Sequence, residues 1–186
     1  MAENLILNKR YAKALFNLAE ESGQIETVYT DMTLVKKVCQ ENVSLLSVLK
    51  SFVVRHDKKS KIITRVFSET ISALALKFIL FIIRKGREKC LIGIIDAYID
   101  IYREYKDIVP AILYTTEPAD EEIKEQIISV LRQFTQSTIE LENKIDKNLI
   151  GGFRLFFDGH LYDASLFTKF KKLNRSFSIN VYDKSF

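Results

Sequence analysis

Few side chains in this sequence have the type and spacing that catalysis or metal binding requires. His56 and His160 lie in different halves of the chain, and neither has a second ligand at a metal-binding spacing. Cys39 and Cys90 form no Cys-x-x-Cys pair, so we expect two reduced cysteines at inward-facing helix positions. Ser165 lacks the Gly-x-Ser-x-Gly context of a nucleophile elbow. The sequence therefore predicts no catalytic residue, no metal site and no cofactor.

Two glycine motifs near the C-terminal end could be mistaken for ligand-binding loops. Gly151-Gly152 lacks the second spaced glycine and the following Lys-Ser/Thr that a P-loop needs. The pair instead indicates a turn between two strands, where glycine permits a positive φ. Asp158-Gly159 likewise indicates a turn after a strand. We predict a structural role for both motifs.

A basic cluster is the remaining candidate site, and it consists of Arg55, Lys58, Lys59, Lys61 and Arg65. As a nucleic-acid patch it lacks interleaved aromatic residues and any known docking motif. A solvated helix face is the favoured interpretation.

The elements that would position these residues fall into two groups with different charge. The chain has 186 residues, of which 47% are hydrophobic, so it can bury a sizeable core. Residues 1–107 carry 18 Lys and Arg against 13 Asp and Glu, whereas residues 108–186 carry 10 against 11. The most apolar stretch, residues 74–83, is far shorter than the roughly 20 residues of a membrane span. With no secretory signal in view, we expect a soluble or at most peripheral protein with two units.

Hydrophobic periodicity predicts helices over residues 5–21, 25–40, 43–53, about 58–67, 69–85 and 87–105. Gly23 and Gly86 are expected to end helices, and Asp57 is expected to be an N-cap. The pattern then changes to strands over residues 108–116, 138–145 and 153–157, with helices over residues 120–136 and 163–177. The predicted fold is mainly α, with a six-helix bundle (1–106) and a smaller C-terminal α/β domain of order β-α-β-β-α (107–186).

The first and fifth helices have more apolar surface than one core contact needs. The first has an apolar arc wider than the stripe of about 100° that a surface helix buries. Both helices could sit centrally in the bundle, or each could face the core on one side and a partner helix on the other. The residues at the edges of these arcs are Leu7, Tyr11, Ala14 and Leu18 on the first helix, and Leu74, Lys77 and Phe81 on the fifth.

Three segments carry a family resemblance that covers nearly the whole chain. RYAKALF (residues 10–16) resembles a Tyr-Ala-x-Ala-Leu-Phe signature, and RKGR (84–87) resembles a Gly-Arg stop after a fifth helix. DKNLIGGF (146–153), followed by DASL (163–166), resembles an Asp-Pro-Ser-Leu-Ile-Gly-Gly and Asp-Gly-Ser pattern, with Lys147 in place of proline and Ala164 in place of glycine. Together they resemble the delta subunit of bacterial F-type ATP synthase, which is similar to the mitochondrial oligomycin-sensitivity-conferring protein.

The resemblance implies a non-catalytic stator in the peripheral stalk of a complex for ATP synthesis and proton transport. The bundle would bind N-terminal helices of the alpha subunits through the first and fifth helices, using Leu7, Tyr11, Ala14, Leu18, Leu74, Lys77 and Phe81. The C-terminal unit would hold the C-terminal region of the b subunits, with turns at Asp146, Gly151, Gly152, Asp158 and Gly159. We expect one copy per complex and a monomer when the subunit is alone. The subunit would be peripheral on the cytoplasmic face of the bacterial inner membrane and would bind no nucleic acid.

A second interpretation comes from another class of protein. An RNA-binding helical bundle of the antitermination type would use the basic cluster between Arg55 and Arg65, and its RNA affinity would fall steeply with salt. The β-α-β-β-α unit counts against this alternative, because such bundles need no appended α/β domain.

Overall fold

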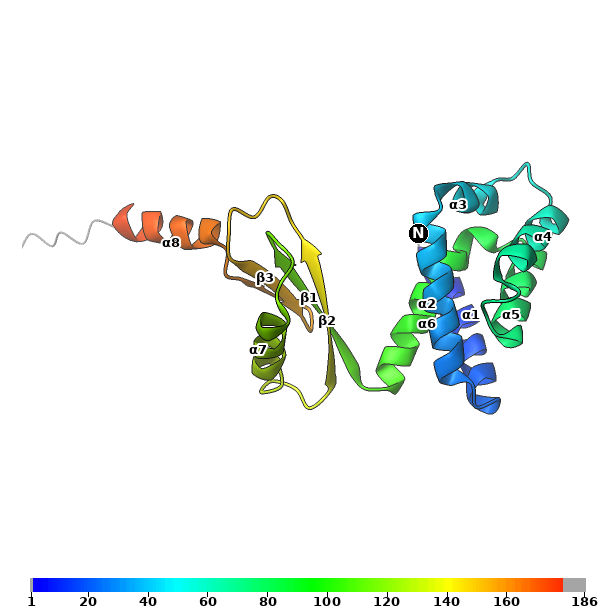
Figure 1. Ribbon diagram of the computed structural model, residues 1–186, viewed down its shortest axis with the longest axis horizontal. Coiled ribbons are helices and arrows are strands. Elements are labelled where there is room, and N and C mark those ends of the chain that lie inside the picture. Colours follow the sequence, from blue (N-terminus) through cyan, green and yellow to red (C-terminus); the bar gives the residue numbers. More distant parts are fainter. Residues whose placement is uncertain (1, 179–186) are drawn as a thin grey trace, which may run out of the picture. The chain divides into compact units, whose positions relative to one another are not determined.

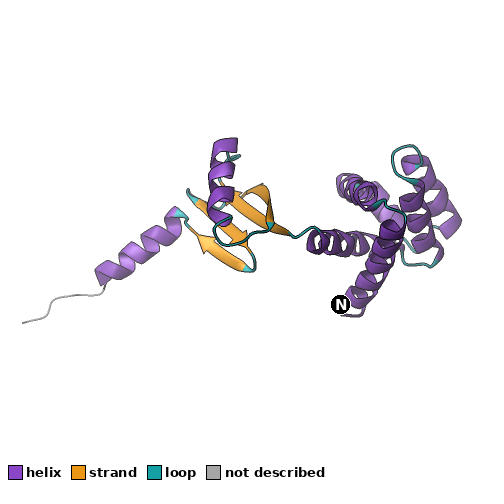
Figure 2. Ribbon diagram, turned by 90° about the horizontal axis from the view of Figure 1, so that it is seen from below, coloured by secondary structure: helices purple, strands orange, loops and turns teal. Residues whose placement is uncertain are grey.

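A computed structural model describes residues 2–178, and the chain divides after Tyr105 into two compact units, Met1–Tyr105 and Lys106–Phe186 (Figures 1 and 2). The first unit is helical throughout, and the second combines a sheet with two helices. The fold class predicted from the sequence is confirmed.

Unit 1 is a bundle of α1 (Ala2–Glu21), α2 (Ile25–Glu41), α3 (Val43–Lys50), α4 (His56–Phe67), α5 (Ala73–Arg84) and α6 (Leu91–Tyr105), with a short 3-10 turn, η1 (Glu88–Cys90), before α6. α6 packs against both α1 and α2, and α4 packs against α5. Buried side chains from all six helices, among them Leu15, Met32, Ile79 and Tyr98, form one core. The packing of this core determines which sides of α1 and α5 face the solvent.

Several helix boundaries differ from the sequence prediction, and two of the differences concern the residue that caps a helix N-terminus. α4 begins at His56 after an extended Arg55, so Asp57 lies in its first turn and is not the N-cap. α5 begins later than predicted because Ser72 caps it: the Ser72 Oγ accepts a hydrogen bond from the Ala75 N–H at 3.3 Å. Gly23 and Gly86 follow α1 and α5 with φ values of +66° and +67°, as expected for helix stops.

Unit 2 consists of β1 (Ile108–Thr115), α7 (Glu121–Leu131), β2 (Thr138–Ile145), β3 (Phe153–Phe157), β4 (His160–Asp163) and α8 (Leu166–Ser178). The strand order is β2-β1-β3-β4. β1 and β2 are parallel and joined by α7, and the other neighbouring pairs are antiparallel. α7 covers one face of the sheet (Figures 1 and 2), where Leu131 packs with Ala111, Leu113, Leu155 and Phe157.

The fourth strand was missed by the sequence analysis. Asp158 and Gly159 both have positive φ, 47° and 74°, which is the backbone of a two-residue type I′ hairpin turn. The turn pairs Phe157 with His160 and starts β4. All four residues of β4 are exposed, so this strand has no buried and exposed alternation from which periodicity could reveal it.

Candidate partner-binding surface

The residues considered for catalysis or metal binding do not come together. His56 and His160 are both exposed, in different units, and no group of three potential metal ligands exists among residues 2–178. Cys39 is buried, and this burial raises the pKa of its thiol. Cys90 is half-buried, less enclosed than the inward position predicted for it. Ser165 is buried at the start of α8, where its Oγ accepts a hydrogen bond from the Thr168 N–H.

The seven residues predicted to bind a partner form one stripe on α1 and one on α5. On α1 the buried positions are Ala12, Leu15, Phe16 and Ala19. The neighbouring stripe, at spacings of three and four residues, is Leu7, Tyr11, Ala14 and Leu18, all exposed or half-buried. The corresponding stripe on α5 is Leu74, Lys77 and Phe81, also exposed or half-buried. Each helix therefore has one face in the core and an adjacent, mostly apolar stripe that is only partly packed against it.

The two stripes meet at Tyr11 and Phe81. Their ring centroids are 6.3 Å apart at an interplanar angle of 56°, which is a favourable tilted arrangement. Phe81 stays 43% exposed, and the Lys85 Nζ lies 5.5 Å from its ring centroid. If a partner covered the rest of this ring, the burial would contribute about 2 kcal/mol to the free energy of binding, at roughly 25 cal/mol per Å² of apolar surface. We call Leu7, Tyr11, Ala14, Leu18, Leu74, Lys77 and Phe81 the α1–α5 surface.

Two further exposed apolar residues at the start of α1 were missed by the sequence analysis, and both lie off the stripe of Leu7, Tyr11, Ala14 and Leu18. Leu5 and Ile6, in the first turns of α1, are 61% and 64% exposed. The signal was present in the sequence as three consecutive apolar residues, 5–7, of which a single core-facing stripe can bury only part.

The five predicted turn residues lie at two ends of the sheet in unit 2. The Asp146 side chain accepts hydrogen bonds from the Asn148 N–H and from the Arg154 guanidinium, which closes the turn after β2 onto β3. Gly152 has a φ of +79°, and a Cβ there would lie 2.5 Å from the Ala164 carbonyl oxygen. A Cβ on Gly151 would meet the Leu166 side chain at 2.7 Å. Asp158 and Gly159 form the hairpin turn described above.

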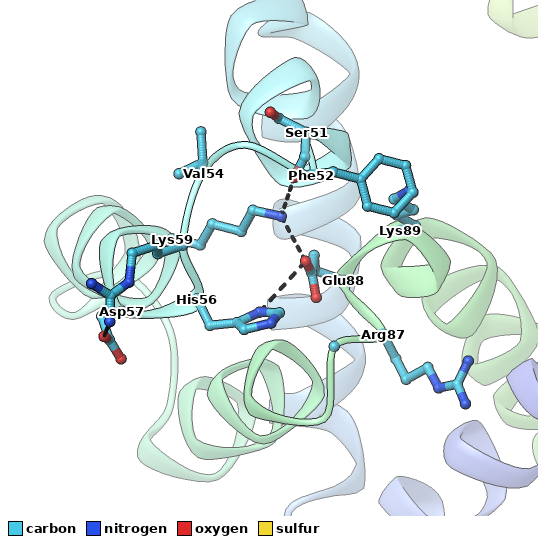
Figure 3. A pocket seen from close by; sticks show the side chains of 11 residues that line it. Ser51, Phe52, Val54, His56, Asp57, Lys59, Arg87, Glu88 and Lys89 are labelled. Atoms are coloured by element: carbon cyan, nitrogen blue, oxygen red, sulfur yellow. Dashed lines mark hydrogen bonds and ion pairs between the residues drawn. The ribbon is translucent and has the colours of Figure 1, made fainter.

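Lys59 overturns part of the prediction that the basic cluster is a solvated face. It is 1% exposed, and its Nζ donates to the Leu49 and Ser51 carbonyl oxygens at 2.9 and 2.7 Å. It also forms a 2.6 Å ion pair with the Oε1 of Glu88, which is 6% exposed (Figure 3). Lys59 faces inward because it shares the buried side of α4 with Ile63 and Phe67.

The Lys59–Glu88 pair forms one wall of an open pocket of about 630 Å³ between the start of α4 and η1 (Figure 3). The His56 Nδ1 lies 3.7 Å from the Glu88 Oε1. Burial alone would raise the pKa of Glu88, but the hydrogen bond and charge of Lys59 outweigh burial and the pKa is lowered. The pair ties the α3–α4 loop to η1, and nothing in its geometry indicates a reacting group.

Among the exposed apolar residues of unit 2, two groups come from its helices. An open pocket of about 310 Å³ between α7 and β3 is lined by the apolar side chains Ile123, Ile127, Val130, Leu131, Phe153 and Leu155. On α8, Leu166, Phe167, Phe170 and Leu173 are all exposed. Their spacing places Leu166, Phe170 and Leu173 on one side of the helix.

Comparisons with known proteins cover nearly the whole chain. The family model described as ATP synthase delta (OSCP) subunit matches residues 7–177. The chain is 30% identical to ATP synthase subunit delta of Cytophaga hutchinsonii, over 92% of this chain and 94% of that protein. It is 32% identical to ATP synthase subunit delta of Parabacteroides distasonis, over 90% and 93%. A chain in the cryo-EM structure of the Toxoplasma gondii mitochondrial ATP synthase hexamer has the same fold, with a TM-score of 0.72 at 20% identity, over 94% of this chain and 99% of that one.

Proposed function

The chain belongs to the ATP synthase delta (OSCP) subunit family, and from this premise we propose how its two units connect the parts of the complex. As a member it is a non-catalytic stator subunit of F-type ATP synthase, which acts in ATP synthesis and proton transport. Family membership decides against the RNA-binding alternative. The proposal concerns which surface binds which neighbour.

Unit 1 binds the catalytic head through the α1–α5 surface. The occupant is the N-terminal helix of an alpha subunit, lying with its apolar side on Tyr11 and Phe81. The observation that carries this proposal is the exposure of Phe81 beside Tyr11, on two helices that also supply the buried core. A partner helix would bury this apolar surface without any rearrangement of the bundle.

Unit 2 binds the C-terminal region of the b subunits. Support comes from two of its exposed apolar areas, the pocket between α7 and β3 and the apolar side of α8. Domain 1–106 would thus hold the head and domain 107–186 the stalk. A subunit held at both ends resists the torque of the rotor, because the head cannot turn without stretching or shearing the connection.

The location follows from the complex. Within residues 2–178 no helix has the length and apolar character to cross a membrane. We propose a peripheral position on the cytoplasmic face of the bacterial inner membrane, with one copy per complex, reached through the b subunits.

The test replaces Phe81 with Asp and measures the affinity of the full chain for an alpha-subunit N-terminal peptide. Phe81→Asp removes apolar contact and places a charge in the interface, so we expect the affinity to fall at least tenfold. Val66→Asp is the matched control, since Val66 is 44% exposed on α4 and Phe81 is 43% exposed. Equal affinities of wild type and Phe81→Asp, with helicity retained, would exclude the α1–α5 surface as the binding site.

A further inference from the structure

Positive charge in unit 1 is concentrated in one part of the chain. Residues 50–89 contain eleven Lys and Arg against three Asp and Glu, a net charge of +8. Residues 1–49 contain five Lys and Arg against six Asp and Glu, and residues 90–107 contain two Lys and Arg against four Asp and Glu. The mild net charge of the whole chain therefore conceals a strongly basic region made of α4, α5 and their flanking loops.

Within this region, unpaired cations gather between α4 and α5. Lys61 and Arg65 are one helical turn apart on α4, and Arg84 ends α5. An open pocket of about 380 Å³ lies between them, and the hydroxyl-bearing residues Ser60, Thr64 and Ser68 complete its polar lining. No acidic side chain lines this pocket, and none of the three cations forms an ion pair with a residue in the described part of the chain.

We propose that this α4–α5 basic pocket binds an acidic helical segment of a partner protein. Lys61 and Arg65 are separated by about 6 Å along the helix axis, the same spacing as two glutamates four residues apart on a facing helix. The guanidinium groups of Arg65 and Arg84 can each bind a carboxylate through two hydrogen bonds. Leu80 also lines the pocket and offers apolar surface to the partner segment.

The lining favours carboxylates over phosphates and nucleic acid. Phosphate sites in proteins commonly use the free N–H groups of a helix N-terminus or a glycine-rich loop. Lys61, Thr64 and Arg65 lie in the middle and second half of α4, where the backbone N–H groups are already bonded within the helix. No aromatic side chain lines the pocket to stack on a base. This second contact goes beyond the α1–α5 surface and shares none of its residues.

The first experiment uses the full chain and a synthetic amphipathic helical peptide with glutamates at i, i+4 and i+7. Fluorescence anisotropy at near-physiological salt should show binding that falls at least tenfold when the peptide glutamates are replaced by glutamine. Arg65→Glu and Arg84→Glu should each weaken binding at least tenfold. Lys9→Glu, on the exposed side of α1, should leave it unchanged. Unchanged binding in Arg65→Glu and Arg84→Glu, or stronger binding of a single-stranded oligonucleotide at the same pocket, would overturn the proposal.

The second experiment uses the assembled ATP synthase, with a photo-crosslinking amino acid in place of Thr64. The expected product joins this position to a segment rich in Asp and Glu in another subunit. A crosslink to a segment without acidic residues, or no crosslink, would overturn the proposal. The two contacts can be tested independently. Phe81→Asp should weaken binding of the alpha-subunit peptide and leave binding of the glutamate peptide unchanged, whereas Arg65→Glu should do the reverse.

Discussion

Replacing Lys59 with Met should cost unit 1 a large part of its stability. In the wild type the Lys59 ammonium satisfies the Leu49 and Ser51 carbonyl oxygens and the Glu88 carboxylate, and both charged residues are almost fully buried. Met fills a similar volume but leaves the Glu88 carboxylate buried without its cation. Removing one partner of a buried ion pair costs about 3–5 kcal/mol, which is comparable to a third or more of the stability of a typical domain.

A second substitution separates the penalty of the unpaired charge from the loss of packing. In Lys59→Met/Glu88→Leu both charges are gone, so the double variant should recover at least half of the stability that Lys59→Met loses. Lys58→Met is the matched control, because Lys58 is the exposed neighbour on the same helix, and it should change stability by less than about 0.5 kcal/mol.

Urea unfolding followed by far-ultraviolet circular dichroism suits this comparison, because the chain has no tryptophan and unit 1 contains most of the helices. The lowered pKa of Glu88 adds a pH test. A carboxyl whose pKa falls on folding stabilises the protein above its unfolded value of 4.5, and this contribution is lost as pH falls through the folded pKa. The double variant should therefore lose less stability on acidification than the wild type. A cost below about 1 kcal/mol for Lys59→Met, or a double variant as unstable as the single one, would refute the reasoning.

Three substitutions test the local structure of unit 2. Gly152→Ala should destabilise the sheet more than Gly159→Ala. Both glycines have positive φ, but only at Gly152 would a Cβ collide with backbone atoms. Hydrogen exchange of the β3 amides measures the difference. Equal protection in the two variants would show that the close approach to Ala164 is unimportant. Hydrogen bonds from Ser165 and Thr168 lower the pKa of Asp163, and their contribution to the stability of the α8 N-terminus is lost as pH falls through that lowered value. Asp163→Asn should therefore remove a pH-dependent fraying of α8. Amide exchange at Thr168, compared between wild type and Asp163→Asn across the acid range, checks this, and identical acid profiles would contradict it.

Much of the fold could be predicted because local chemistry and tertiary packing agree. Gly23 and Gly86 marked helix ends through a backbone conformation that other residues avoid, and alternation over residues 138–145 located β2. β4 was missed because its four residues are all exposed, which leaves the Asp158-Gly159 turn as the main signal for it in the sequence. α5 begins at Ala73, later than predicted, because the capping hydroxyl of Ser72 decides a boundary that hydrophobic periodicity leaves open.

The candidate surfaces were predictable only in part. The α1–α5 stripes followed from helical spacing, since Leu7, Tyr11, Ala14 and Leu18 recur at intervals of three and four. Residue type does not separate Lys59 from Lys58 and Lys61, but helical spacing does, because Lys59 lies four and eight residues before the buried Ile63 and Phe67. Its ion pair with Glu88 could not be predicted, because Glu88 is distant in sequence and reaches Lys59 only through the packing of η1. Charge counts likewise did not reveal the pocket between Lys61 and Arg84, which needs α4 and α5 side by side.

The connection between the two units has a mechanical consequence. Only Lys106 and Asp107 separate α6 from β1. α6 is the helix that packs on both α1 and α2, and β1 is the strand that pairs with both β2 and β3. Any tension applied between the units therefore enters each of them at a central element. Extracting β1 lengthwise would shear two ladders of hydrogen bonds at once, whereas an edge strand loaded in the same way would have only one to resist the pull.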